Sequence, residues 1–240
     1  MLIGLTLVAY HYGGNKMFVY VYAQPTRVRP YHMVSEQIVV KDGKEKILSK
    51  ETEDHSQTGA THKLLVRRSP NKDITFRSVR GADGSVALIM DEIHAKATGM
   101  PPAEKLAAQN FNAHHPASCV EGAEVVEGHE QLFGQNAVRV SIKQKTEMET
   151  RLLAWKLLEF NCLVAQDFTQ VKGPNGEWQT VQGNRLTAFF EAEPDPVLFT
   201  DWQSYTEMKP GDMKAKWSQA NGFTPESCPD CFRPDRSDKN

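Results

Sequence analysis

Four cysteines carry the most reactive side chains of this chain, and two of them, Cys228 and Cys231, form a CxxC pattern near its end. Such a pair can hold a metal ion, act as a redox dithiol or close a small structural disulfide. A zinc site usually needs two close pairs, so that four thiolates complete a tetrahedron, but Cys119 and Cys162 stand far apart. No βαβ pattern surrounds the CxxC, which disfavours a thioredoxin-type role.

Disulfides are the preferred interpretation, because an even number of cysteines in an exported protein most naturally forms pairs. Cys162 stands at the start of a predicted strand, and Cys119 lies in the loop before another. We predict that Cys119 pairs with Cys162. We also predict that Cys228 pairs with Cys231 and clips the loop of the tail.

Three of the histidines suggest a metal site: His114 and His115 in "AHHPASC", and His129 in "EGHEQ". Adjacent residues on an extended chain point to opposite faces, so His114 and His115 cannot easily hold one ion together. We therefore expect no metal site and no cofactor.

Catalytic signatures are missing from the sequence. It contains no nucleophile elbow, no helical HExxH, no phosphate-binding glycine loop and no Rossmann fingerprint. Glu193 and Asp195 stand close together in "EPDPVLF", but the two prolines favour a turn that ends a strand, with residues 197–199 plugging the core. No combination of acid, base and nucleophile is visible, and we predict that the protein is not an enzyme.

The composition is that of a globular protein, with 40% apolar residues in 240 and a formal charge of -2. This charge provides no basic field for nucleic acid. The most charged stretch, "KDGKEKILSKETED" at residues 41–54, contains both signs. We interpret it as the solvated faces of strands rather than as a docking patch.

The first 23 residues are predicted to be a signal peptide or a membrane-anchoring leader. Two apolar runs, residues 1–10 and 17–23, are separated by "HYGGNK", which breaks the roughly 18 residues that a membrane span needs. Val21 and Ala23 suit a cleavage site before Gln24. The alternative is that residues 17–23 form a first β-strand. Export would place the protein in the periplasm or elsewhere in the cell envelope.

Residues 24–222 are predicted to form a single β-rich domain of short alternating strands and tight turns, followed by a tail at 223–240. Asp42-Gly43 and Asn175-Gly176 are hairpin turn signals. Short helices are expected at residues 101–111 and 211–222. The apolar positions that alternate with polar ones include Val34, Ile38, Val40, Leu64, Val66, Ile74, Phe76, Val86, Leu88, Val138, Val140 and Ile142. Four aromatic residues are expected to fill the core: Trp155, Trp178, Phe189 and Phe190.

The order of these parts is similar to that of a group of exported bacterial proteins. It runs from "PYHMVSEQIVVKDGKEKI" through "HEQLFGQNAVRVSI" and "LLAWKLLEFNCLVAQDF" to "AEPDPVLF" and a later Tyr. That group resembles the lipoprotein carriers of the bacterial envelope (the LolA/LolB-like fold). The resemblance implies a mainly β (α+β) fold, in which a strongly curved antiparallel sheet or half-barrel wraps round one or two short helices as a plug. This chain departs from the pattern in having Ala where a Gly is usual before "EPDP", in a leader that lacks a positive charge before its first apolar run, and in its CxxC tail.

Two functional hypotheses follow from the resemblance. In the first, the apolar alternating positions line the concave face, which holds a lipid, an acyl chain, another hydrophobic ligand or a protein. In the second, the protein is an interaction subunit of an envelope assembly, with the leader retained as an anchor and the sheet docking a partner by its edge. Membrane association is then peripheral or through the leader.

Overall fold

The computed structural model describes residues 10–13, 16–19, 29–68, 73–82, 85–98, 117–144, 149–222 and 224. Within these residues, two short strands pair with each other, and twelve others form one sheet. The short pair is β1 (Tyr10–Gly13) and β2 (Lys16–Val19). In spatial order, the sheet consists of β14 (Thr206–Glu207), β8 (Ala95–Thr98), β7 (Val86–Met90), β6 (Ile74–Arg80), β5 (Thr61–Arg67), β4 (Lys44–His55), β3 (Tyr31–Lys41), β13 (Trp178–Phe190), β12 (Leu163–Lys172), β11 (Thr150–Leu157), β10 (Gln135–Gln144) and β9 (Val125–Leu132).

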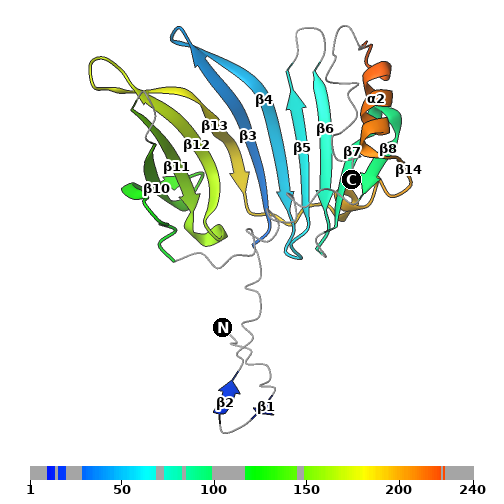
Figure 1. Ribbon diagram of the computed structural model, residues 1–240, viewed down its shortest axis with the longest axis horizontal. Coiled ribbons are helices and arrows are strands. Elements are labelled where there is room, and N and C mark those ends of the chain that lie inside the picture. The colour runs from blue at the N-terminus through cyan, green and yellow to red at the C-terminus, as the bar shows by residue number, and fades with distance from the viewer. Residues whose placement is uncertain are drawn as a thin grey trace.

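This sheet is open and strongly curved (Figure 1). All its described pairs are antiparallel except β14 with β8. Sequential hairpins build each half, and β13 then returns to pair with β3, which joins the halves at the centre. The prediction of a mainly β protein with a curved antiparallel sheet is confirmed.

The turn signals have the backbone geometry that they predict. Asp42 and Gly43 have φ angles of 52° and 70° and join β3 to β4 through a two-residue turn, as expected for a primed hairpin turn. Gly176, at φ 81°, reverses the chain between β12 and β13. Local sequence therefore sets the strand pairing next to each turn, and an irregularity further along each hairpin then shifts the register.

Three short 3₁₀ helices and one α-helix complete the described elements: η1 (Asp91–Ile93), η2 (Leu158–Phe160), η3 (Pro196–Phe199) and α2 (Pro210–Ala220). The expected second helix is confirmed, but it begins at Pro210, where the fixed φ of proline suits the first helical position. Gly222, at φ 75°, follows its end. The expected helix at 101–111 lies outside the described residues. None of the helices in the described part of the chain has the length and apolar character needed to cross a membrane.

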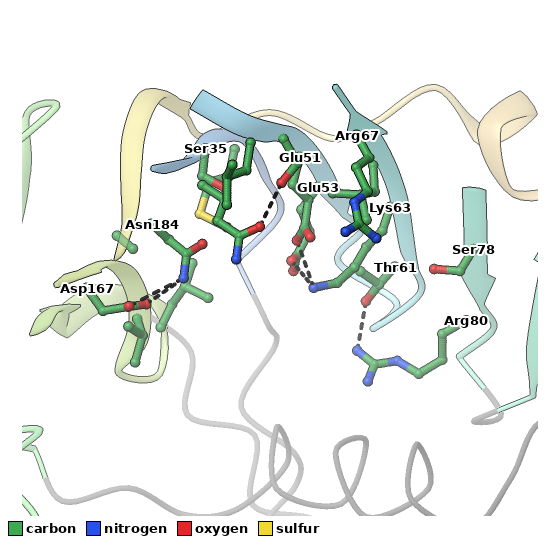
Figure 2. A pocket seen from close by; sticks show the side chains of 18 of the residues that line it. Ser35, Glu51, Glu53, Thr61, Lys63, Arg67, Ser78, Arg80, Asp167 and Asn184 are labelled. Atoms are coloured by element: carbon green, nitrogen blue, oxygen red, sulfur yellow. Dashed lines mark hydrogen bonds and ion pairs between the residues drawn. The ribbon is translucent and has the colours of Figure 1, made fainter. Parts of the chain in front are cut away.

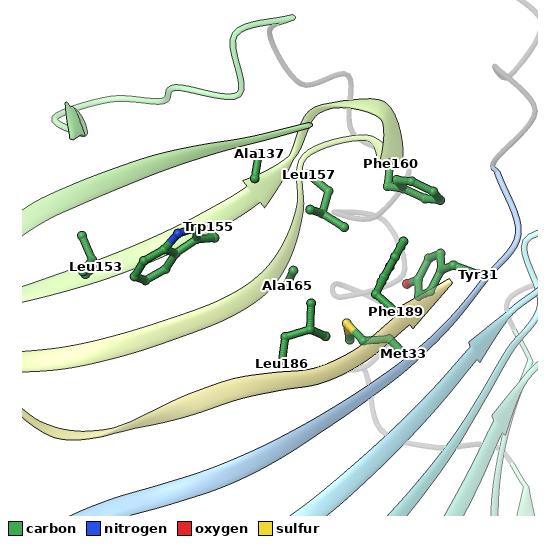
Figure 3. Close-up of a cluster of buried hydrophobic side chains, with 10 residues drawn as sticks. All are labelled: Tyr31, Met33, Ala137, Leu153, Trp155, Leu157, Phe160, Ala165, Leu186 and Phe189. Carbon is green, nitrogen blue, oxygen red and sulfur yellow. The ribbon is translucent and has the colours of Figure 1, made fainter. Parts of the chain in front are cut away.

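We call the face of the sheet that carries Met33, Leu65 and Leu186 the inner face. Its largest apolar cluster lies over β3 and β10–β13 (Figure 3). The Phe189 ring stacks on Tyr31 with centroids 5.6 Å apart and meets Phe160 edge-on at 4.8 Å. The cluster consists of Tyr31, Met33, Ala137, Leu153, Trp155, Leu157, Phe160, Ala165, Leu186 and Phe189.

The aromatic core fillers are only partly as expected. Trp155 and Phe189 are buried, and Trp178 is half-buried beneath the Arg151 guanidinium, 4.5 Å from its ring. Phe190 was wrongly assigned to the core, because it is 52% exposed and stacks on His32 with centroids 4.6 Å apart. Successive strand residues point to opposite faces, so Phe189 and Phe190 cannot both enter one core.

At the β6–β8 end, both faces of the sheet are covered. On the inner face, Met213 and Trp217 of α2 pack with the apolar residues Ile74, Phe76, Leu88, Met90, Ala95 and Ala97. On the opposite, outer face, Val79, Ala87 and Ile89 pack against Phe199, Trp202 and Tyr205. Of the predicted core plug at 197–199, Phe199 joins this cluster, but Val197 is 58% exposed.

The outer face of β10 and β11 is covered by residues 117–124. A disulfide joins Cys119 to Cys162, with Cα atoms 5.3 Å apart, and it packs with Val138, Val140 and Ala154. This predicted pair is confirmed. Cys228 and Cys231 lie outside the described residues, as do His114, His115 and most of the predicted leader.

Candidate binding site

A hollow of about 980 Å³ opens on the inner face between the two halves of the sheet (Figure 2). Strands β3–β7 supply one side, and β12 and β13 supply the other. Its polar lining consists of Ser35, Gln37, Ser49, Glu51, Glu53, Thr61, Lys63, Arg67, Arg68, Ser78, Arg80, Asp167 and Asn184. Its apolar lining includes Met33, Leu48, Leu65, Val86, Leu163, Val164 and Ala165.

The expectation that the alternating apolar positions line the concave face is wrong for the centre of the sheet. Val34 and Ile38 alternate with the hollow-lining Met33, Ser35 and Gln37, so they lie on the outer face. Leu64 and Val66 are likewise on the outer face of β5. Val138 and Val140 are buried under residues 117–124. In the central strands, the apolar positions at Val34, Leu64 and Val66 are half-buried on the outer face and do not face the hollow.

The floor of the hollow is formed by a buried carboxylate. Glu53 lies opposite Lys63 in the β4–β5 register, and the Lys63 Nζ is 2.6 Å from its Oε2. The Tyr31 hydroxyl donates to the other carboxylate oxygen at 2.6 Å. Burial by itself raises the pKa of Glu53, but Lys63 and Tyr31 outweigh burial and lower that pKa overall. Glu53 is therefore a buried, ion-paired anion.

Next to this pair, His55 is completely buried. Its Nδ1 lies 3.0 Å from the Thr61 hydroxyl oxygen, and its ring stacks on Tyr31 with centroids 5.1 Å apart. Burial lowers the pKa of His55 to about 4, so the imidazole is neutral at neutral pH. Arg80 donates to the same Thr61 hydroxyl at 2.8 Å.

The charged stretch at 41–54 was interpreted as solvated, and this is wrong at its end. Glu53 and Asp54 are each 6% exposed, because they lie near the end of β4, where three successive residues are buried. On the outer face, Asp54 accepts from His32 at 2.7 Å and from His62 at 3.1 Å. Burial raises the pKa of Asp54, but the two imidazoles outweigh burial and lower it. No sequence motif connects these residues, which meet only through strand register.

At the rim of the hollow lie Arg67, the last residue of β5, and Arg68. Both are exposed, and neither forms an ion pair with any residue that the structure describes. On the opposite wall, the carboxylate of Asp167 accepts from the Asn184 amide at 3.1 and 3.3 Å. The hollow is thus cationic on its β5 side and anionic on its β12 side.

The other sequence candidates do not enter the hollow. Glu193 accepts from the Gln57 backbone N–H at 3.0 Å, and Asp195 caps η3 by accepting from the Val197 N–H at 2.9 Å. Asp195 therefore caps the turn that the prolines predicted, and Glu193 links this segment to the turn between β4 and β5. His129 is exposed on edge strand β9. Among the described residues, no three His, Cys, Asp or Glu side chains are grouped so that they could hold a metal ion.

No protein-family model and no curated protein matches the chain. Solved structures of similar shape include the Pseudomonas aeruginosa MucA/MucB complex, at 12% identity and a TM-score of 0.42 over 72% of this chain and 56% of that one. LprF from Mycobacterium bovis matches at 10% identity and a TM-score of 0.29, over 70% and 90%. A putative outer membrane lipoprotein-sorting protein domain from Vibrio parahaemolyticus matches at 8% and 0.23, over 72% and 90%. The chain spans just over half the length of the first of these, and likeness at these levels assigns no function.

Proposed function

We propose that this protein is a non-enzymatic binding protein of the cell envelope, with a lipoprotein-carrier-like fold, and that its inner hollow receives a segment of a partner protein. The observation that carries the proposal is the polar lining of the hollow over a buried Glu53–Lys63 pair. At about 980 Å³, the hollow lies at the upper end of the roughly 300–1,000 Å³ typical of ligand sites.

The chemistry of the lining favours a polypeptide over a bare acyl chain. An acyl chain over the floor would keep water from the half-exposed Lys63 without offering its ammonium group a hydrogen bond, and uncompensated burial of polar groups is costly. A peptide can hydrogen-bond to the open Ser35 and Ser78 hydroxyls while its apolar side chains contact Met33 and Leu65.

An envelope location is supported by the Cys119–Cys162 disulfide. Such bonds persist in oxidising compartments and are rare in the cytosol. The leader at residues 1–23 would provide export, anchoring or both, as expected from its apolar runs.

A second candidate ligand is an amphiphilic lipid, which one specific feature favours. Leu163, Val164 and Ala165 form an apolar edge where β12 enters the hollow, and Val164 is 44% exposed. An acyl chain placed along this edge would avoid the charged floor.

Native mass spectrometry of the protein purified from its own envelope fraction tests the proposal. We expect a retained polypeptide adduct, whereas a lipid mass would favour the second candidate. Ser78→Trp should remove the adduct by filling the hollow. Lys50→Trp is the matched control, because Lys50 is exposed on the outer face of the neighbouring strands, opposite Val66. An adduct that survives Ser78→Trp, or the lack of any adduct on the unaltered protein, would exclude binding in the hollow.

A further inference from the structure

We infer that the partner segment is acidic and that Arg67 and Arg68 anchor it at the β5 side of the hollow; this rests on the proposed function. The inference begins with the charges of the lining. Two acids, Glu51 and Glu53, share the Lys63 ammonium at 3.3 and 2.6 Å. Arg80 adds a second cation to the same floor. The positive and negative charges of the floor therefore balance. Its two acids are not available to neutralise the arginines at the rim.

The two rim arginines are held by the sheet rather than by a loop. Arg67 is paired with Ser49 in the β4–β5 register, and the Arg68 N–H donates to the Leu48 carbonyl at 2.9 Å. Figure 2 shows the Arg67 side chain above Lys63, on the same side of the hollow. Two guanidinium groups thus project from a fixed strand end with no acidic partner among the described residues.

The wall opposite the two arginines carries a negative charge, so the two sides of the hollow differ in charge. Asp167 faces the hollow from β12, and among the described residues its hydrogen-bond partner is an uncharged amide, that of Asn184. An extended segment is matched to these walls when its carboxylates lie at Arg67 and Arg68 and a donor group lies at Asp167. Planar guanidinium groups bind carboxylates through paired hydrogen bonds, which fixes orientation as well as charge.

An anionic lipid headgroup would offer the arginines the same charge. Its acyl chains would then have to cross from Arg67 over Glu53 and Lys63 to reach the apolar edge at Leu163, and they would cover the ion pair without hydrogen-bonding to it. A peptide that runs in the same direction meets hydroxyl groups on the way. The lining therefore favours the acidic polypeptide.

Two fluorescent peptides of equal length and identical apolar residues test the inference, one with glutamates and the other with lysines at the remaining positions. We expect the glutamate peptide to bind about tenfold more tightly at about 50 mM salt, and the preference to weaken at about 500 mM. The double variant Arg67→Glu/Arg68→Glu should reverse the preference. Lys50→Glu, which reverses a charge on the outer face of the same strand pair, should leave it unchanged. Both sites are exposed, so the variants should fold, which circular dichroism checks.

The outcomes separate this inference from the proposed function. If both peptides bind equally, or the lysine peptide binds better, and Ser78→Trp abolishes binding, then the hollow binds peptides but the acidic preference is wrong. If neither peptide binds up to about 1 mM, the inference is overturned, and the native mass spectrum still decides the proposed function. If anionic vesicles bind in an Arg67-dependent manner while neither peptide binds, the anchor belongs to a lipid headgroup, which also overturns the inference.

Discussion

Lys63 and Glu53 face each other across β4 and β5 with the Lys63 Nζ 2.6 Å from the Glu53 Oε2, yet only the carboxylate is buried. The side chain of Glu53 is 8% exposed and that of Lys63 is 45% exposed. The floor of the hollow therefore depends on a cation that water and a ligand can both reach.

Removal of this cation should destabilise the protein. Lys63→Met leaves the buried Glu53 with the Tyr31 hydroxyl as its remaining hydrogen-bond partner among the described residues. Breaking a buried pair on one side costs about 3 kcal/mol at the lower end of the usual range, and the lower end applies because Lys63 is partly exposed. Urea unfolding should show this loss. The double variant Glu53→Gln/Lys63→Met should recover most of it, and Lys50→Met should have no effect. A double variant less stable than Lys63→Met would contradict the ion-pair interpretation.

Acid should weaken the fold through His55. Burial lowers the pKa of His55 to about 4 from 6.5, so the unfolded chain binds a proton that the folded protein excludes. This contribution to stability is complete above about pH 6.5 and is lost as the pH falls toward 4. It amounts to roughly 3 kcal/mol. His55→Phe keeps the stack on Tyr31 and should flatten unfolding free energy against pH in this window.

The matched control for His55 is His129→Phe on the exposed face of β9, which removes one histidine without opening a buried site. The unaltered protein and the His55→Phe variant are expected to differ most in the slope of the unfolding free energy against pH, rather than in the unfolding free energy at a single pH. Equal slopes for the two proteins would show that His55 does not exclude a proton in the folded state.

The Cys119–Cys162 bond should stabilise the protein by constraining the unfolded chain. Its cysteines are 43 residues apart, for which the loop-entropy relation gives about 4 kcal/mol. The double variant Cys119→Ser/Cys162→Ser should lose about this free energy of unfolding. Tris(carboxyethyl)phosphine should reproduce the loss in the unaltered protein and have little further effect on the variant. A variant as stable as the parent would mean that residues 117–124 stay in place without the bond.

Gly183 should tolerate no side chain. A Cβ there would lie 2.2 Å from the Asp167 carbonyl oxygen and 2.8 Å from the Phe168 Cα, and backbone on a paired strand cannot move aside. Gly183→Ala should therefore destabilise the protein by about 3 kcal/mol. Gly128→Ala is the control on another strand, because its Cβ would meet only the flexible Arg139 guanidinium at 3.5 Å. Thermal unfolding of both variants measures the difference.

Much of the fold could be predicted because its signals are local. Asp42-Gly43 and Asn175-Gly176 specify hairpins, Gly222 marks the end of α2, and period-2 alternation identifies the strands. The resemblance added the curvature that these local signals do not contain. Even the disulfide followed from cysteine parity and the strand positions.

The hollow could not be predicted, because a period of two distinguishes the two faces of a strand without saying which face is concave. Val34 and Met33 illustrate this, since either could have pointed inward. Segments distant in the sequence determine which face of a strand is buried. The helix α2 covers the inner face at Phe76, and residues 196–205 cover the outer face at Val79. Once both faces are partly covered, apolar residues belong on each.

The amino-acid sequence by itself indicated the mainly β composition, the two hairpin turns and the approximate position of α2, since these depend on backbone preferences within a few residues. Only the tertiary structure decided that Glu53, Lys63 and Tyr31 meet at the floor of a hollow with Arg67 at its rim. These side chains come together through the register of β3, β4 and β5 and the curvature of the whole sheet. Those properties are set by hydrogen bonds and packing between segments far apart in the chain, and no short stretch of sequence contains them.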